Sequence, residues 1–178
     1  MRRDVARLAG DVGPGAGRPS ARRPLTGGGN AAKIHPMRYL GVDLGRARVG
    51  LALGDDVLRT ARAHRTLRRT GLARDLAAIA RVASDFEVSR VVLGLPLNMD
   101  GTEGPRCQSI RQFAANIAAH APPALASLPV VLQDERMSTA AVTRGMIDDY
   151  DMSRAKRAER VDAAAAAWIL ESALARLR

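Results

Sequence analysis

The order of apolar segments after residue 36 is the feature that most constrains the fold of this chain. Three short apolar segments separated by brief turns come first, and they predict an antiparallel meander. Two further apolar segments each follow a stretch with helical spacing, which predicts parallel strands joined by crossover helices. The predicted strands are 38–45, 48–54, 60–67, 90–95 and 129–132, and the predicted helices are 72–83, 105–120, 140–149 and 160–178. This order predicts an α/β domain in which helices flank a five-stranded mixed sheet.

Residues 1–36 differ in composition from the rest of the chain. They contain seven Gly and four Pro, and they carry half of the formal net charge of +10. No apolar stretch recurs there with the period of a helix or a strand. We therefore expect 1–36 to be a disordered basic tail and 37–178 to be the folded domain, with Met37 as a candidate native start.

The composition excludes several classes of protein. The single cysteine, Cys107, rules out an internal disulfide and a cysteine-based zinc cluster. No apolar run approaches the roughly 20 residues that a membrane helix needs, so we expect a cytoplasmic protein without a membrane partner. The basic balance favours a polyanionic partner such as nucleic acid. Aromatic residues make up only 3% of the chain, which argues against base stacking as the main source of affinity.

Asp43 lies inside the first predicted strand, between Val42 and Leu44. Aspartate is depleted in strands, and burial of a lone carboxylate is costly unless its charge is compensated. A turn role beside Gly45 is the alternative, but the position within the strand favours a functional role.

Two further acidic positions are candidates. Asp162 shares a helix face with apolar residues that should pack on the sheet, and it is either a favourable acid near a helix start or a site ligand. The pair Asp134-Glu135 follows the last strand, where sites form in sheets of this type. Neighbouring residues on an extended segment point to opposite faces, so spacing leaves the choice between them open, and Arg136 could pair with either.

Acids that converge from a strand, a strand end and a helix would need a cation to offset their repulsion. Oxygen ligands without a nearby His or Cys favour Mg²⁺ or Mn²⁺ over zinc. Such a centre on a basic protein suits phosphodiester hydrolysis.

Four blocks of this sequence, in order, resemble the YqgF (RuvX) family. The blocks are Gly41–Gly45 with Arg48–Ala52, Gly94–Gly104, Asp134–Thr139, and Ser153–Arg157 leading to Val161–Leu170. The resemblance covers residues 38–177 and implies an RNase H-like fold and a metal-dependent nuclease. It implies Asp43, Glu135 and Asp162 as the catalytic, metal-binding residues, and only the resemblance selects Glu135 over Asp134.

The resemblance also implies a substrate. Members are proposed to mature the 5′ end of pre-16S rRNA and were earlier described as Holliday junction resolvases. We therefore expect RNA as the partner, free or within a ribosomal particle, with branched DNA as the alternative and the protein as a monomer or weak dimer. A non-catalytic nucleic-acid-binding module and an actin-like ATPase are further alternatives. The ATPase would need two such domains, and 37–178 provides one.

Basic and amide side chains are candidates for nucleic-acid binding. Arg154, Lys156 and Arg157 could contact phosphates or simply form a solvated face. Arg48 could orient the site or a phosphate, or lie exposed at a turn. Asn98 opens a Gly-containing loop, 98–104, that is either an ordinary turn or a close approach to the RNA backbone.

Overall fold

A computed structural model describes residues 36–136 and 154–177 of the chain. The elements are β1 (Arg38–Leu44), β2 (Arg48–Asp55), β3 (Ala61–Arg68), α1 (Leu72–Asp85), β4 (Arg90–Leu95), α2 (Pro105–His120), α3 (Pro123–Ala126), β5 (Val130–Asp134) and α5 (Arg154–Leu174). The predicted tail, 1–36, falls outside the described residues except for Pro36. The predicted helix 140–149 lies outside them entirely.

The strands form one five-stranded sheet in the order β3-β2-β1-β4-β5. The pairs β1–β2 and β2–β3 are antiparallel, and the pairs β1–β4 and β4–β5 are parallel. This confirms the predicted mixed sheet, with the Asp43 strand at its centre. No helix among the described residues is long and apolar enough to span a membrane.

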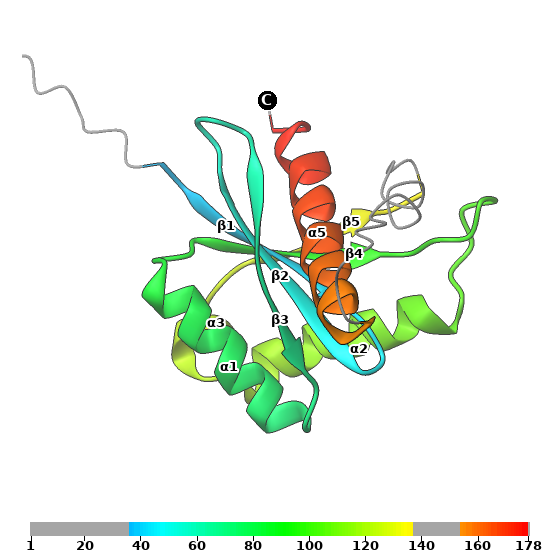
Figure 1. Ribbon diagram of the computed structural model, residues 1–178, viewed down its shortest axis with the longest axis horizontal. Helices are drawn as coiled ribbons and strands as arrows, with labels where there is room; N and C mark the ends of the chain where they lie inside the picture. The colour runs from blue at the N-terminus through cyan, green and yellow to red at the C-terminus, as the bar shows by residue number, and fades with distance from the viewer. Residues whose placement is uncertain (1–35, 137–153, 178) are drawn as a thin grey trace, which may run out of the picture. The chain divides into compact units, whose positions relative to one another are not determined.

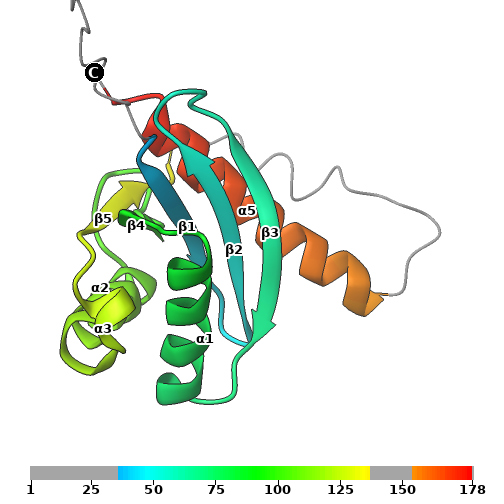
Figure 2. The ribbon, with the colours of Figure 1, turned by 90° about the vertical axis from the view of Figure 1, so that its left-hand side faces the viewer.

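Helices cover both faces of the sheet. Figure 2 shows α1, α2 and α3 on one side and α5 on the other, and Figure 1 shows α5 lying across the strands. Alternation along β1 divides the two cores, since Leu40, Val42 and Leu44 pack with α1 and α2 while Tyr39 packs with α5. The α5 face of β1 therefore continues through Gly41 to Asp43.

Most boundaries differ from the sequence prediction by one or two residues, and three differences are larger or concern a whole element. α3 was not predicted, because four residues introduced by Pro122 and Pro123 are too short to show a period. β5 runs on through two polar residues, Gln133 and Asp134, because they continue the parallel ladder with β4. The last helix begins at Arg154 rather than near residue 160.

α5 lies unusually close to the sheet where its small residues meet a glycine. A Cβ built on Gly50 of β2 would lie 1.9 Å from the backbone oxygen of Asp162. Any side chain at this position would have to displace the helix backbone. Gly50 and the alanine run that follows Asp162 thus set the depth at which α5 is seated.

Candidate functional site

Asp43 lies near the end of the central strand and is buried, with 8% of its surface exposed. It stands directly opposite Gly50 of β2 in the antiparallel register. Directly opposed residues of an antiparallel pair project to the same face, and the missing side chain of Gly50 would point at α5. The Asp43 carboxylate therefore projects from the sheet toward the α5 side.

Asp162 lies on α5, at the point where the helix contacts Gly50. Its Oδ2 accepts a hydrogen bond from Nε of Arg48, at 2.5 Å. Arg48 is the first residue of β2. Both side chains are partly exposed, so this ion pair contributes at most about 1 kcal/mol to stability. It does fix the direction of the Asp162 carboxylate, and it places Arg48 beside this candidate residue.

The structure separates Glu135 from Asp134. Gln133 pairs with Gly94 of β4, and Glu135 projects to the same face two residues later. A Cβ on Gly94 would lie 2.0 Å from Oε1 of Glu135, so the carboxylate sits over the space left by this glycine. The N–H of Glu135 donates to the oxygen of Leu95 at 3.1 Å, which holds its backbone in line with the sheet.

Asp134 has a different environment. Its Oδ2 accepts a hydrogen bond from Nη2 of Arg136 at 2.8 Å, and its Oδ1 accepts from the Arg136 backbone N–H at 2.9 Å. These hydrogen bonds hold the pKa of Asp134 below its ordinary value. Asp134 thus forms the local ion pair that the sequence left open, and Glu135 is the acid on the α5 face.

Asp43, Glu135 and Asp162 therefore share one face of the sheet, although they come from three elements. β1 and β4 are neighbours, and Gly94, beneath Glu135, lies one residue beyond the last registered pair, Val42 with Leu93. Within 36–136 and 154–177, however, no group of three or more Asp, Glu, His or Cys side chains is placed to hold a metal ion. In this arrangement Asp162 is paired with Arg48, and the three-acid metal centre stays a prediction. The donor types do suit a hard divalent cation.

Four other residues were candidates for nucleic-acid binding, and the structure describes the side chain of one of them, Asn98. Asn98 closes its own loop, because its Nδ2 donates to Oγ1 of Thr102 at 2.9 Å and its backbone N–H donates to the Thr102 oxygen, also at 2.9 Å. The side chains of Arg154, Lys156 and Arg157 lie outside the described part of the chain.

Sequence reasoning missed two groups at this end of the sheet. Gly50 and Gly94 leave the room that Asp162 and Glu135 occupy, and only the strand register reveals this. Three arginines, Arg46, Arg69 and Arg106, line a pocket at the end of β1. They are far apart in the sequence, and no spacing rule connects them.

The chain resembles known proteins over most of its length. Residues 37–176 match the family model described as "RuvX: Holliday junction resolvase". Relatives named "Putative pre-16S rRNA nuclease" include one from Methylocella silvestris, 46% identical over 83% of this chain and 88% of the relative. Another, from Anaeromyxobacter dehalogenans, is 51% identical over 79% of this chain and 98% of the relative.

Solved structures also match. One is described as T. thermophilus RuvC in complex with Holliday junction substrate; it is 16% identical, covers 80% of this chain and 98% of its own, and has a TM-score of 0.47. A Thermus thermophilus RuvC structure is 17% identical over 78% and 94%, with a TM-score of 0.45.

The family model and the similar relatives confirm the resemblance read from the four sequence blocks. The strand order, with three antiparallel strands followed by two parallel ones, is that of the expected RNase H-like fold. The chain is accordingly a nuclease, a hydrolase that acts on phosphodiester bonds, and its substrate is a nucleic acid. Nucleases of this kind use divalent metal ions. On the evidence of the family model and of relatives that are about half identical, the chain belongs to the RuvX family.

Proposed function

We propose that this chain is a metal-dependent endonuclease that processes the 5′ end of pre-16S rRNA, with Asp43, Glu135 and Asp162 as its catalytic and metal-binding residues. One observation carries the site: a buried aspartate on the central strand faces the side of the sheet where two further acids lie. The names of the relatives support the RNA substrate. The nuclease domain is residues 37–178, and 1–36 is a tail.

The three acids would be held with different degrees of rigidity. Asp43 is fixed by the β1–β2 ladder, in which it pairs with Gly50, and Glu135 by its backbone bond to Leu95. Asp162 is fixed by the contact of α5 with Gly50. Bound Mg²⁺ or Mn²⁺ would activate water and stabilise the leaving oxygen. Arg48 orients Asp162 and adds a positive charge beside the position of the scissile phosphate.

Recognition would rest on the RNA backbone rather than on its bases, since aromatic residues are scarce. Arg154, Lys156 and Arg157 at the start of α5, and the loop opened by Asn98, would contact phosphates and sugars on either side of the cut. The enzyme would work in the cytoplasm, as a monomer or weak dimer, on free RNA or on a ribosomal particle.

The test uses the full chain with Mg²⁺ or Mn²⁺ and an RNA that spans the 5′ leader junction of 16S rRNA. Asp43→Asn and Glu135→Gln should abolish cleavage and leave RNA binding and the unfolding temperature close to wild type. Two matched controls, Asp134→Asn and Asp85→Asn at the end of α1, should cleave normally. Wild-type cleavage by Asp43→Asn would refute the site.

A four-way DNA junction, offered in parallel, tests the second candidate function, which the description of the matching family favours. Cleavage of the junction but not of the RNA would replace the ribosomal role with resolution of branched DNA. Cleavage of neither, by protein that binds RNA, would leave a binding module or an enzyme that requires the ribosomal particle as substrate.

A further inference from the structure

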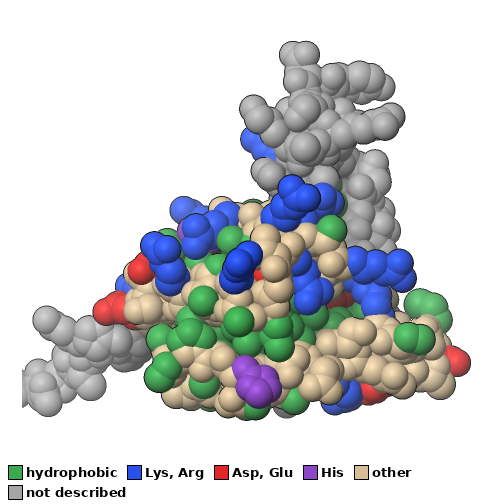
Figure 3. Space-filling view, turned by 90° about the horizontal axis from the view of Figure 1, so that it is seen from below, with side chains coloured by type: hydrophobic (Ala, Val, Ile, Leu, Met, Phe, Trp, Pro, Cys, Tyr) green, Lys and Arg blue, Asp and Glu red, His purple; other side chains and the backbone are tan. Residues whose placement is uncertain are grey.

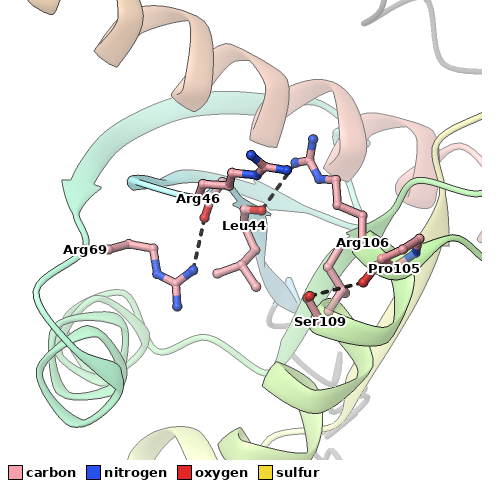
Figure 4. Close-up of a pocket in the computed structure, with 8 residues that line it drawn as sticks. Leu44, Arg46, Arg69, Pro105, Arg106 and Ser109 are labelled. Carbon is pink, nitrogen blue, oxygen red and sulfur yellow. Dashed lines mark hydrogen bonds between the residues drawn. The ribbon is translucent and has the colours of Figure 1, made fainter.

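A pocket of about 180 Å³ opens at the end of β1, and arginines from three separate segments line it. Arg46 lies in the β1–β2 turn, Arg69 lies between β3 and α1, and Arg106 lies in the first turn of α2. Figure 4 shows the three arginine side chains together with Ser109 of α2, which also lines the pocket. The pocket has several times the space that a water molecule needs.

The pocket carries an excess of positive charge. Arg69 pairs with the buried carboxylate of Asp75, at 3.2 Å from Nε to Oδ2. Among the described residues, neither Arg46 nor Arg106 forms an ion pair. Both residues line the same pocket, whose described lining residues include no acid. Two like charges held together without an acid between them are stabilised by a bound anion.

The arginines are also held in place by backbone oxygens of β1 and its turn. Nη2 of Arg106 donates to the oxygen of Leu44 at 3.4 Å, and Nη1 of Arg69 donates to the oxygen of Gly45 at 3.1 Å. Each guanidinium has five N–H donors, so most of them stay available to a ligand. Arginine pairs with phosphate through two parallel hydrogen bonds, which is the geometry that this arrangement offers.

The pocket and the acid face lie at the same end of β1. Leu44 lines the pocket and directly follows Asp43, and the two side chains project to opposite faces of the strand. A nucleic-acid strand that passes around the end of β1 with one phosphate at Asp43 would therefore bring another of its phosphates to the arginines.

A wider groove of about 560 Å³ continues from the pocket along α2. It shares Leu44, Arg69 and Ser109 with the pocket and runs past the amides of Gln112 and Asn116. Figure 3 shows a face on which Lys and Arg side chains are numerous and acidic side chains are few. An extended groove that leads out of an arginine pocket fits a polymer better than an isolated small anion.

We propose that Arg46, Arg69 and Arg106 form a binding subsite for a backbone phosphate of the nucleic-acid substrate, on the same strand as the phosphate that is cut. The subsite rests on the proposed function of the acid face, because it is defined relative to Asp43. It recognises phosphate and not sequence, so it contributes affinity and register along the strand.

Binding is measured with the full chain carrying Asp43→Asn, so that RNA stays intact. Arg46→Ala and Arg106→Ala should each weaken binding by about three- to tenfold, and each should reduce the slope of log affinity against log salt by about 0.7. Arg81→Ala is the matched control, since Arg81 is an exposed arginine toward the other end of α1. Arg69 is left unchanged because it balances the buried Asp75.

Inorganic phosphate is the second probe. It should shift the NMR signals of the Gly45 and Ser109 amides in wild type and not in the Arg46→Ala, Arg106→Ala double variant. Unchanged RNA affinity and salt slope in the double variant would overturn the subsite. If inorganic phosphate nevertheless bound at the wild-type pocket, the pocket would serve a free anion instead. An absence of RNA binding by the Asp43→Asn parent would overturn it as well.

The two proposals fail in distinguishable ways. If the arginine variants bind RNA more weakly than their parent but the wild-type chain cuts neither substrate, the nuclease role fails and the phosphate subsite stands. If cleavage is normal and the arginine variants bind and cut as wild type does, the subsite fails and the nuclease role stands.

Discussion

Replacement of Gly94 by alanine tests whether Glu135 works from its position over β4. A Cβ on Gly94 would lie 2.0 Å from Oε1 of Glu135 and 2.6 Å from Cδ1 of Ile169. A relaxed carbon–oxygen contact is about 3.3 Å, so the carboxylate oxygen must move by about 1.3 Å. Both obstructing atoms are the ends of flexible side chains, so the backbone can keep its place.

The expected effect on stability is small, and the expected effect on activity is large. Shifts of the two side chains from their preferred rotamers cost about 0.5–1.5 kcal/mol each, and alanine in a strand recovers about 0.5–1 kcal/mol relative to glycine. We expect a net loss below about 2.5 kcal/mol, which lowers Tm by less than about 10 °C. A catalytic group displaced by about 1 Å costs on the order of 100-fold in rate.

Single-turnover cleavage of the junction RNA, with thermal unfolding followed by circular dichroism, measures both effects. Asp85→Asn is the control, because Asp85 is exposed at the end of α1, on the other side of the sheet from α5. Cleavage by Gly94→Ala at the wild-type rate would refute a working position of Glu135 over this glycine. A large fall in Tm with a proportional fall in activity would show that the backbone had moved instead.

Three further outcomes follow from the contacts. Gly50→Ala pushes on the backbone oxygen of Asp162, so it should cost about 1–3 kcal/mol and abolish cleavage; a wild-type Tm would contradict the close seating of α5. Arg48→Ala frees the Asp162 carboxylate, so added Mn²⁺ should raise Tm more than it does in wild type, and an equal rise would exclude competition between Arg48 and the metal. Desolvation beside Phe86 holds the pKa of His64 below its ordinary value, so the unfolded chain takes up the proton more readily. Stability should therefore fall as the pH drops below about 6.5, and His64→Gln should flatten urea-unfolding profiles between pH 7.5 and 5.5.

The sheet could be predicted from the sequence because each of its strands can be recognised on its own. Each is a short apolar run bounded by turn residues, and the run around Asp43 is apolar enough to indicate the central strand. The order of strands and helices then leaves few topologies. α3 could not be predicted in this way, since a single turn between prolines buries only Leu125 and carries no period.

The site depends on register, which the sequence does not reveal. Their positions in the sequence do not distinguish Asp134 from Glu135, since both are acids at the end of a predicted strand. Only the pairing of Gln133 with Gly94 assigns Glu135 to the α5 face. The arginine pocket is still less visible, because turns and helix starts bring its members together after α1 and α2 have packed.

The two sites at the end of β1 are built in opposite ways, and this difference suits their proposed roles. On the acid face, glycines let a helix backbone and a carboxylate come into direct contact with the strands, so Gly50 and Gly94 leave little room for adjustment. A centre that must hold reacting atoms to within a fraction of an ångström benefits from such rigidity. The pocket on the other face relies on long arginine side chains, and those of Arg46 and Arg106 are exposed. These side chains can follow a phosphate whose position varies with the bend of the strand, while the cut is made at a fixed point.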